Sequence, residues 1–536
     1  MPASSVGPRQ WWGLVAIALG VSMIVVDTTI VNVITPSVID DLGISSSQAQ
    51  WVQESYAIMF AALLLLFGRV ADLVGARRVF VLGAVVFGVT SLLAGIASSG
   101  NVLILARFLQ GAAGAMLLPT SLSLLNQTFT GKARGQAYAV WGSTIGAATA
   151  LGPVLGGWLS EHASWRWAFG INIPLVVVIV ALSLVFIPMS KRTAGRVDVP
   201  GALLSFAGLA ALAFGLIEGR VYGWVTSRSP FTVLGQTWDG GLSPVFVALV
   251  IAAALLALFV RRQVSLSRNG SGGEPLMNTR LFRISSFRNG NIATLIIGLG
   301  EFGIIAVIPL WLQFTLGYTS LEAGFALVPL ALGSFLASGL SFGLKLSALA
   351  LVRIGLVLEA VTLAALGVVA ATTSAPWWSV ALVLFGYGIG VGFATAQVTN
   401  VVLADVPDDQ GGQGSGIQST FRQLGSALGI AAITTIFFSA LDNGVRTNLR
   451  AEDLPGDQID RFAAAVTDSA GAVIAPLAGD PVTAVVARAA RDAMTHGVEL
   501  GSYVAAGFLV LGVLATLLIP APRTAVTAEI PEELPV

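Results

Sequence analysis

The chain has 536 residues, of which 55% are apolar and only 10% are charged, whereas soluble domains carry roughly 25% charged residues. The formal net charge is zero, which argues against a nucleic-acid partner, and there is no cysteine, which excludes disulfides and thiolate chemistry. Apolar runs of about 20 residues recur along the chain, and each is long enough to cross a bilayer. This composition predicts an all-α integral membrane protein in contact with the lipid bilayer.

Hydropathy predicts fourteen membrane spans. They cover residues 11–35, 48–67, 79–97, 101–124, 136–159, 166–188, 199–217, 243–260, 288–313, 321–343, 349–371, 376–402, 413–438 and 499–519. An even number of spans places both termini on one side. Most Lys and Arg residues fall in the connections of that side, and the short connections of the other side hold only Arg166, Arg220 and Arg228. Both termini are therefore expected in the cytoplasm of a bacterial cell, with the spans in its plasma membrane.

The spans divide the chain into five parts. These are an N-terminal six-helix bundle (1–190), two inserted helices (191–262), a basic cytoplasmic linker (263–287), a C-terminal six-helix bundle (288–520) and a cytoplasmic tail (521–536). The second bundle includes a long outer connection, 439–498, which is Ala-rich with scattered Asp, Arg and Gly. We expect short helices there and assign the segment no role.

The connection after the second span contains a recognisable motif, GRVADLVGARR. Gly68 and Gly75 permit a tight turn, Asp72 can accept hydrogen bonds at the N-terminus of a neighbouring helix, and Arg77 and Arg78 hold the loop in the cytoplasm. A generic cytoplasmic loop explains the arginines but not two glycines spaced around an aspartate. The motif resembles the signature loop of the major facilitator superfamily. The resemblance implies a cytoplasmic gate in which Asp72 latches the two bundles near the start of span 413–438.

Two further motifs are similar to patterns of that superfamily. Span 101–124 carries Arg107-Phe-Leu-Gln110-Gly, and a structural ion pair is the alternative reading of its arginine. Span 136–159 carries an antiporter-type motif, for which a simple packing seam is the alternative. Its residues are Gly152, Pro153, Gly156 and Gly157. Proline removes a helix hydrogen bond and the glycines leave a smooth face, so this helix can bend.

Two more segments resemble the fourteen-span drug:proton antiporters within that superfamily. Asp27-Thr28-Thr29 is similar to the signature of their first helix, and the segment 164–174 is similar to the start of their sixth. The resemblance implies a major facilitator fold with two six-helix bundles and two inserted helices. It also implies a proton gradient as the energy source, no cofactor and no metal.

Three charged residues lie inside the N-terminal spans. At about 1.5 Å per residue, Asp27 lies roughly 12 Å and Arg107 roughly 9 Å from the outer ends of their helices, with Glu54 at a similar depth. A carboxylate at such a depth costs about 2.5–3.5 kcal/mol and needs a partner, so it marks a functional site. We expect Arg107 to pair with Asp27 and the three residues to form one proton-coupling cluster.

The C-terminal spans carry a second group of polar residues. Glu301 shares a helix face with Asn291 and Thr294, which suggests a water-filled cavity. Glu359 is as consistent with a structural acid as with a functional one. The residues assigned to substrate binding are Glu301, Asn291, Thr294, Phe302, Tyr56, Trp141, Tyr387, Gln418 and Arg422. Their aromatic rings can accept a lipophilic cation.

The acids within the spans outnumber the bases, and this excess of acids favours a cationic or proton-competing substrate. The acids are Asp27, Glu54, Glu301 and Glu359, and the bases are Arg107 and Arg422. Both histidines fall in outer connections, so proton coupling must use carboxylates. No HExxH motif, cysteine or intramembrane histidine supports an enzyme. We therefore expect a monomeric antiporter that exports lipophilic, cationic or neutral drug-like molecules in exchange for protons. The alternative is a dedicated exporter of one endogenous metabolite, antibiotic or lipid.

Overall fold

The computed structural model describes residues 7–190, 192–233, 236–269, 274–341, 344, 346–371 and 375–519. The cytoplasmic tail expected at 521–536 lies outside these residues. The described chain is helical except for one small hairpin, formed by β1 (Phe231–Val233) and β2 (Gln236–Trp238), which the sequence did not indicate.

The helices of the first half and the inserted pair follow one another along the chain. They are α1 (Pro8–Leu42), α2 (Ser46–Val74), α3 (Ala76–Gly95), α4 (Gly100–Thr128), α5 (Gly131–His162), α6 (Trp167–Gly170), α7 (Asn172–Phe186), α8 (Val199–Tyr222) and α9 (Pro244–Asn269). The second half begins after the short 3₁₀ helix η1 (Thr279–Arg283). Its helices are α10 (Ser285–Phe314), α11 (Ser320–Ala326), α12 (Val328–Leu340), α13 (Ala348–Ala370), α14 (Trp377–Leu403), η2 (Asp408–Gln410), α15 (Gly411–Ala451), α16 (Gly456–Asp468), α17 (Ile474–Gly479) and α18 (Ala484–Leu517).

Thirteen stretches in the described residues are long and apolar enough to cross a membrane. They correspond to thirteen of the fourteen expected spans. The remaining one is α5, which is a continuous helix of 32 residues. Its many Gly, Ser and Thr residues lower its hydropathy, and it packs between other helices rather than facing lipid alone.

Two expected spans are interrupted. The sixth is divided into α6 and α7 at Ile171, and the tenth into α11 and α12 at Leu327. In each case a proline, Pro174 or Pro329, follows within a few residues. Because proline has no N–H to donate, the helical hydrogen-bond ladder is weakened just before it.

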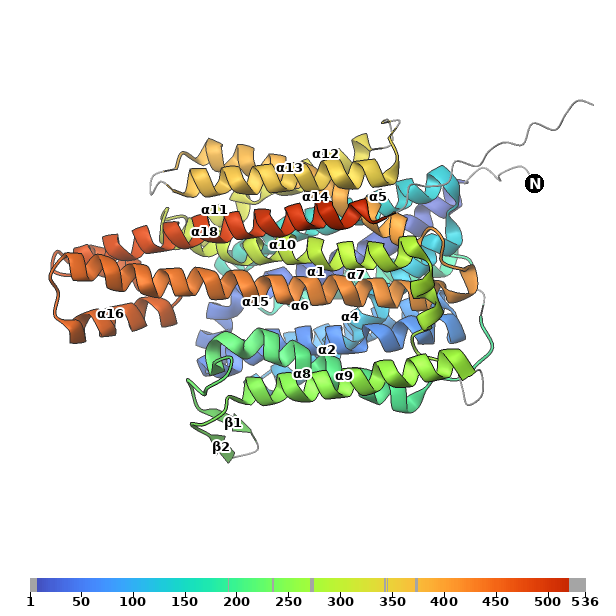
Figure 1. Cartoon of the computed structure of the whole chain (residues 1–536), viewed down its shortest axis with the longest axis horizontal. Helices are drawn as coiled ribbons and strands as arrows, with labels where there is room; N and C mark the ends of the chain where they lie inside the picture. Colours follow the sequence, from blue (N-terminus) through green and yellow to red (C-terminus); the bar gives the residue numbers. More distant parts are fainter. Residues whose placement is uncertain are drawn as a thin grey trace, which may run out of the picture.

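The helices form two bundles (Figure 1). Helices α1 to α7 pack with one another, and so do α10 to α15 with α18. The bundles meet where α2 contacts α15 and where α5 contacts α11, α12 and α14. The inserted helices α8 and α9 pack together on the outside of α2, and α8 also touches α15. They thus join the edge of one bundle to a helix of the other.

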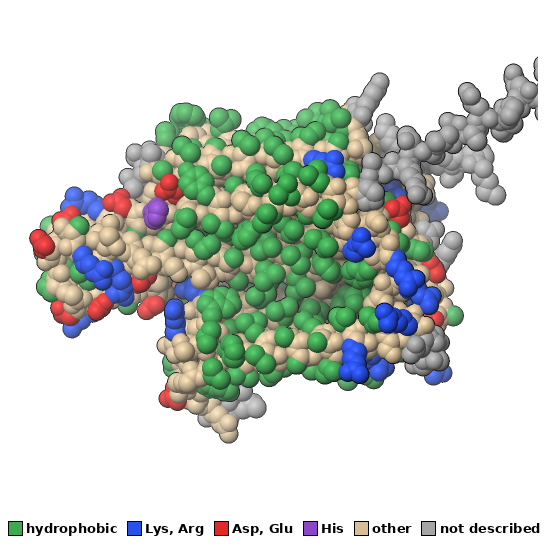
Figure 2. Space-filling model, in the orientation of Figure 1, with side chains coloured by type: hydrophobic (Ala, Val, Ile, Leu, Met, Phe, Trp, Pro, Cys, Tyr) green, Lys and Arg blue, Asp and Glu red, His purple; other side chains and the backbone are tan. Residues whose placement is uncertain are grey.

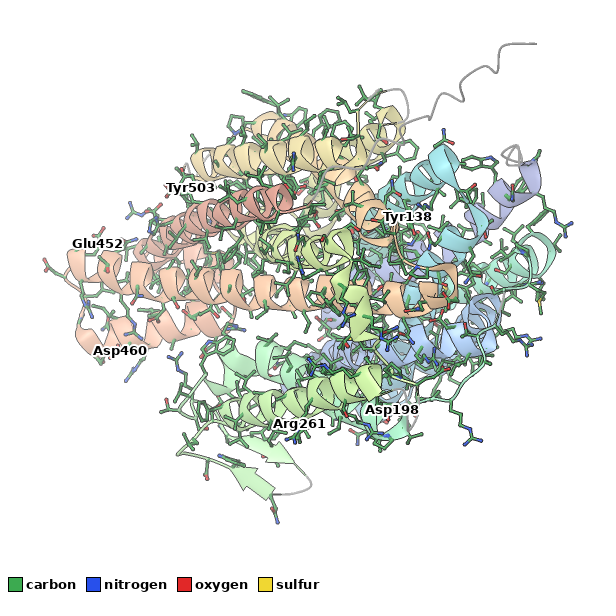
Figure 3. The ribbon with its side chains drawn as sticks, turned by 45° about the vertical axis from the view of Figure 1, so that its right-hand side comes forward. Tyr138, Asp198, Arg261, Glu452, Asp460 and Tyr503 are labelled. Atoms are coloured by element: carbon green, nitrogen blue, oxygen red, sulfur yellow. The ribbon has the colours of Figure 1, made fainter. Side chains whose placement is uncertain are left out.

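The long outer connection is more helical than expected. Helix α15 continues to Ala451 and α18 begins at Ala484, so both extend well past the other helices (Figure 1). Together with α16 they form a projection, and Glu452 and Asp460 lie near its far end (Figure 3). Residues 439–498 therefore contain the short helices that were expected, α16 and α17, and in addition the extensions of the two spans α15 and α18.

The surface separates by polarity along the helix direction. Apolar side chains cover the middle of the molecule, and charged side chains gather at its two ends (Figure 2). Examples of the exposed apolar residues are Leu203 at 63%, Val361 at 60% and Leu514 at 54% of their accessible surface. Such a belt matches the hydrocarbon core of a bilayer.

Candidate functional site

A buried ion pair lies inside the N-terminal bundle. Arg107 of α4 donates from Nη1 to Oδ2 of Asp27 of α1, and the accessible fractions of the two side chains are 1% and 0%. The pairing expected from the sequence is therefore confirmed. The arginine supplies the partner that a carboxylate needs in an apolar surrounding.

Neutral donors complete the environment of Asp27. Gln110 Nε2 donates to Oδ1 of Asp27 at 2.8 Å, and Asn172 Nδ2 donates to the same atom at 3.1 Å. Both amides also donate to the hydroxyl of Ser91, at 2.8 and 3.1 Å. Four helices, α1, α3, α4 and α7, are thus tied together by one polar network, of which Ser91 was not anticipated.

Arg107 has further partners besides Asp27. Its Nε donates to the carbonyl of Val52 at 3.2 Å, its Nη1 to Oε1 of Gln110 at 2.7 Å, and its Cζ lies 4.4 Å from the ring centre of Tyr56. The structure therefore places Tyr56 on the arginine and not on the wall of a substrate cavity, where we expected it. With these contacts the guanidinium keeps partners even when Asp27 is neutral.

In this conformation Asp27 has no exposed surface. Because the side chain is fully buried, proton exchange with bulk water requires a second conformation in which the network opens.

Glu54 does not join the cluster, contrary to the expectation. It accepts a hydrogen bond from Gln50 Nε2 at 2.7 Å, and the same nitrogen donates to Glu218 of α8 at 3.0 Å. Depth along a helix can be counted from sequence, but the direction of the side chain cannot, and Glu54 points toward α8. Glu218 was missed because it lies just past the expected end of its span.

The C-terminal bundle holds a second charged group, formed by Glu301, Glu359 and Arg422. Glu301 is 3% exposed and accepts a hydrogen bond from Thr395 Oγ1 at 2.7 Å. Glu359 is fully buried, and neither of its carboxyl oxygens has a hydrogen-bond partner among the described residues. The three groups interact electrostatically. Two acids facing one base give the group an uncompensated acid.

Aromatic rings of both bundles flank Arg422. Its Cζ lies 5.6 Å from the ring centre of Phe302 and 5.9 Å from that of Trp141, which belongs to α5 of the other bundle. The Trp141 Nε1 donates to Ser121 at 3.0 Å, and the Tyr387 hydroxyl donates to the backbone carbonyl of Glu301 at 3.0 Å. This group therefore lies where the bundles meet, as a substrate site between them would.

The expected polar face of α10 is closed. Asn291 and Thr294 are buried and donate to carbonyls of their own helix, at 2.8 Å in both cases. A Cβ on Gly298, on the same face, would lie 3.1 Å from the backbone of α15. The face packs against α15 here and does not line an open cavity. Gln418 of α15 is likewise buried and donates to Thr399 at 3.2 Å.

The GRVADLVGARR motif forms a latch between the bundles. Both carboxylate oxygens of Asp72 accept hydrogen bonds at the start of α15, from Gly412 N at 2.6 Å and Gln413 N at 2.8 Å. This confirms the contact expected near residues 411–415, and a carboxylate suits the positive end of a helix dipole. A Cβ on Gly68 would lie 2.7 Å from the carbonyl of Gly412, so glycine allows the close approach.

The rest of the motif has other tasks. Gly75 takes a φ of 104° at the turn, a conformation that glycine adopts readily. Arg77 donates to the carbonyl of Leu184 at 2.6 Å, and Arg78 is exposed, so neither arginine contacts Asp72. The linker also reaches the latch, because Glu274 forms an ion pair with Arg69. This contribution of the linker had no signal in the sequence.

The antiporter-type motif lies at two helix contacts. A Cβ on Gly156 would lie 3.0 Å from Ile30 Cγ1, so this side of α5 packs tightly on α1. On another side, a Cβ on Gly324 of α11 would lie 3.3 Å from Pro153, and one on Gly157 would lie 3.5 Å from Leu321. The motif therefore borders both its own bundle and the opposite one. Gly152 also belongs to the α1 contact, where it meets the Thr29 side chain.

The chain is similar to a known family over most of its length. The family model of the Major Facilitator Superfamily matches residues 17–430. A puromycin resistance protein of Streptomyces alboniger is 34% identical over 80% of this chain and 82% of its own length. The multidrug efflux pump LfrA of Mycolicibacterium smegmatis is 29% identical over 95% of this chain and 96% of its own length.

A solved structure supports the same fold. The human organic anion transporter MFSD10 superposes with a TM-score of 0.61 over 95% of this chain and all of its own, at 14% identity. The two six-helix bundles joined by the Asp72 latch, together with these relatives, define the class of protein as a membrane transporter. The chain belongs to the major facilitator superfamily.

Proposed function

We propose that this protein exports lipophilic, cationic or neutral molecules across the bacterial plasma membrane in exchange for protons. The observation that carries the proposal is the uncompensated acid beside Arg422, in a chain related to antibiotic resistance and multidrug efflux proteins. A buried acid without a base must bind a proton or a cationic substrate. Competition for such a site couples the two.

The substrate site in this proposal is the contact region of the two bundles. Glu301 attracts a cation or holds a proton, and the rings of Trp141 and Phe302 bind the apolar part of the ligand. Separation of α10 from α15 would wet Asn291, Thr294 and Gln418. In this arrangement the substrate site forms when the bundles part, which is how transporters with two repeats expose a central site.

Asp27 is the proposed proton-coupling residue, with Arg107 as its modulator. Protonation of Asp27 releases Arg107 to Val52, Gln110 and Tyr56, which already contact it. This exchange of partners would loosen α1 from α4. Because α1 also packs on the Gly152–Gly157 seam of α5, the change can reach the opposite bundle.

The direction of transport follows from the proposed orientation. Most Lys and Arg residues fall in the connections on the same side as Asp72, and we infer that this side is cytoplasmic. The latch at Asp72 then closes the cytoplasmic side while the outer side exchanges protons for substrate. The protein is proposed to act as a monomer.

A dedicated exporter of one compound is the second candidate. A relative named for resistance to puromycin favours it, and a relative named as a multidrug pump favours broad export. The test is accumulation of chemically unrelated toxic dyes and antibiotics in cells with and without the protein. Reduced accumulation of several supports broad export, and reduction of one supports the dedicated exporter. If no compound is affected, the export proposal fails.

A further inference from the structure

Two acids from different parts of the chain meet beside the bundle contact. Glu54 of α2 is 7% exposed and Glu218 of the inserted helix α8 is fully buried. The amide of Gln50 bridges them, with its Nε2 at 2.7 Å from Glu54 and 3.0 Å from Glu218. Because the same nitrogen contacts an oxygen of each acid, the two carboxyl groups are close neighbours. One neutral donor therefore serves two acids.

No cation contacts this pair among the described residues. The nearest base is Arg220, only two residues after Glu218, so it leaves the helix on a different side. Its Cζ lies 4.1 Å from the ring of Phe438 of α15, and it interacts electrostatically both with Glu218 and with Asp468 of α16. The Tyr222 phenol is the remaining titratable group near the pair. The nearby arginine charge is thus shared with α15 and α16.

The hydrogen bonding of the pair is incomplete without a proton. Glu54 Oε2 and Glu218 Oε1 have no donor among the described residues. Two carboxylates in contact repel each other strongly, and sharing one proton removes the repulsion. The same proton supplies the donor that the free oxygens lack. The arrangement therefore fits one neutral acid beside one carboxylate.

The pair lies at a junction of three moving parts. Helix α8 packs on α2 and on α15, and α2 and α15 belong to different bundles. A change in the contact of these bundles therefore alters the space around Glu218. Water that enters there can take up the proton as hydronium, and two carboxylates then remain to push α8 and α2 apart.

We propose that Glu54 and Glu218 form a proton-binding site between α2 and α8, through which the inserted helices take part in proton exchange. The site is separate from Asp27 and from the acids around Arg422. A role of this site in transport rests on the proposed proton antiport. The binding of a proton by the two acids does not depend on that proposal. In this proposal the inserted helices α8 and α9 contribute to proton binding and not only to packing.

The test compares infrared absorption of the full-length protein in lipid nanodiscs at neutral pH. The spectrum of the double variant Glu54→Gln, Glu218→Gln is subtracted from that of the wild type. The difference spectrum is expected to contain the absorption of about one protonated carboxyl group and one carboxylate. The control, Glu452→Gln, changes an exposed acid of the projection and should remove carboxylate absorption only. Loss of carboxylate absorption alone in the double variant would overturn the proposal.

A second measurement tests the link to transport. Tetraphenylphosphonium, a lipophilic cation, is added to each protein in weak buffer and the released protons are counted. The double variant should release fewer protons per bound cation than the wild type and Glu452→Gln. Equal release would overturn the role in exchange. If the wild type itself releases none, the proposed antiport fails, while the infrared result still decides whether the pair binds a proton.

Discussion

Arg107 and Asp27 depend on each other because both are removed from water. A buried charge that loses its partner keeps its desolvation penalty, whereas a pair replaced as a unit does not. Asp27 retains Gln110 and Asn172 as donors, and Arg107 retains Val52 and Tyr56. The remaining partners therefore reduce the loss of stability caused by removing Asp27 or Arg107, but they do not eliminate that loss.

We predict that Arg107→Gln lowers the free energy of unfolding by about 3–5 kcal/mol. Asp27→Asn combined with Arg107→Gln should cost less than Arg107→Gln alone, because no uncompensated charge remains. Denaturant unfolding of the purified proteins in mixed micelles measures both. Strictly additive losses would show that the two side chains do not interact.

Asp198 illustrates a pH-sensitive contact outside the spans. Burial raises the pKa of its carboxyl, but hydrogen bonds from Arg262, Gln263 and the Gly201 N–H outweigh burial and leave the pKa below its ordinary value. A lowered pKa in the folded state stabilises at pH values above the unfolded pKa of about 3.9. That stability is lost as pH falls through the folded pKa.

The wild type should therefore lose stability on acidification below about pH 4 more steeply than Asp198→Asn. The melting temperature of both proteins, measured from neutral pH downward, is the observable. Parallel curves would mean that the Asp198–Arg262 contact between the start of α8 and α9 contributes nothing.

Among the elements, α5 departs most from a simple membrane helix. Gly156 and Gly152 allow it to approach α1, and Pro153 lies inside it without breaking it. Close approach through small residues is how helices associate in lipid, where burial of apolar surface adds little. The same residues lower the hydropathy of α5, so its packing role and its weak span signal have one cause.

Gly156→Ala should reduce the free energy of unfolding by about 1–3 kcal/mol, because its Cβ would press on Ile30 and Val33 at 3.0–3.1 Å. Gly507→Ala in α18 is the matched control, since nothing lies within 4 Å of its Cβ. The control should gain about 0.5–1 kcal/mol from helix propensity. Equal effects of the two changes, in thermal unfolding of the purified proteins, would contradict a tight α1–α5 contact.

The course of the helices was largely predictable, and their ends and breaks were not. Hydropathy locates spans because lipid demands about 20 apolar residues, but it gives no signal where α15 leaves the membrane and continues to Ala451. The break at Leu327 follows from Pro329, yet prolines also occur within unbroken helices such as α5. Local sequence therefore permits a break without requiring it.

Some side-chain contacts could also be predicted from the sequence, and others could not. The Asp27–Arg107 and Asp72–α15 contacts were predicted, since each joins a conspicuous polar group to a motif with known chemistry. Glu54 was assigned to the wrong neighbour because facing depends on which helices pack together. The partners Ser91 and Thr395 are ordinary hydroxyl residues and carry no signal in the sequence.

For the whole molecule, the latch at Asp72 sets how readily the two bundles part at that end. Its two hydrogen bonds involve a charged acceptor, and such bonds contribute about 1.5–3 kcal/mol each. Asp72→Asn should therefore favour opening by about tenfold or more, equivalent to about 1.4 kcal/mol. Arg261→Gln, which changes an exposed arginine of α9 (Figure 3), should have no effect.

The absence of native cysteine makes the latch prediction measurable. A cysteine introduced at buried Ser123 of α4, near the start of α15, can be labelled only when the bundles part. The rate of maleimide labelling should rise in the Asp72→Asn background. An unchanged rate would show that Asp72 does not hold the bundles together.

The central claim is that the protein exchanges protons for substrate with Asp27 as the coupling residue. The most direct measurement follows proton flux in proteoliposomes with a trapped pH-sensitive dye when a lipophilic cation is added under an imposed pH gradient. We predict cation-dependent proton movement in the wild type and its loss in Asp27→Asn that is still folded. Undiminished, proton-coupled transport by Asp27→Asn would contradict the account.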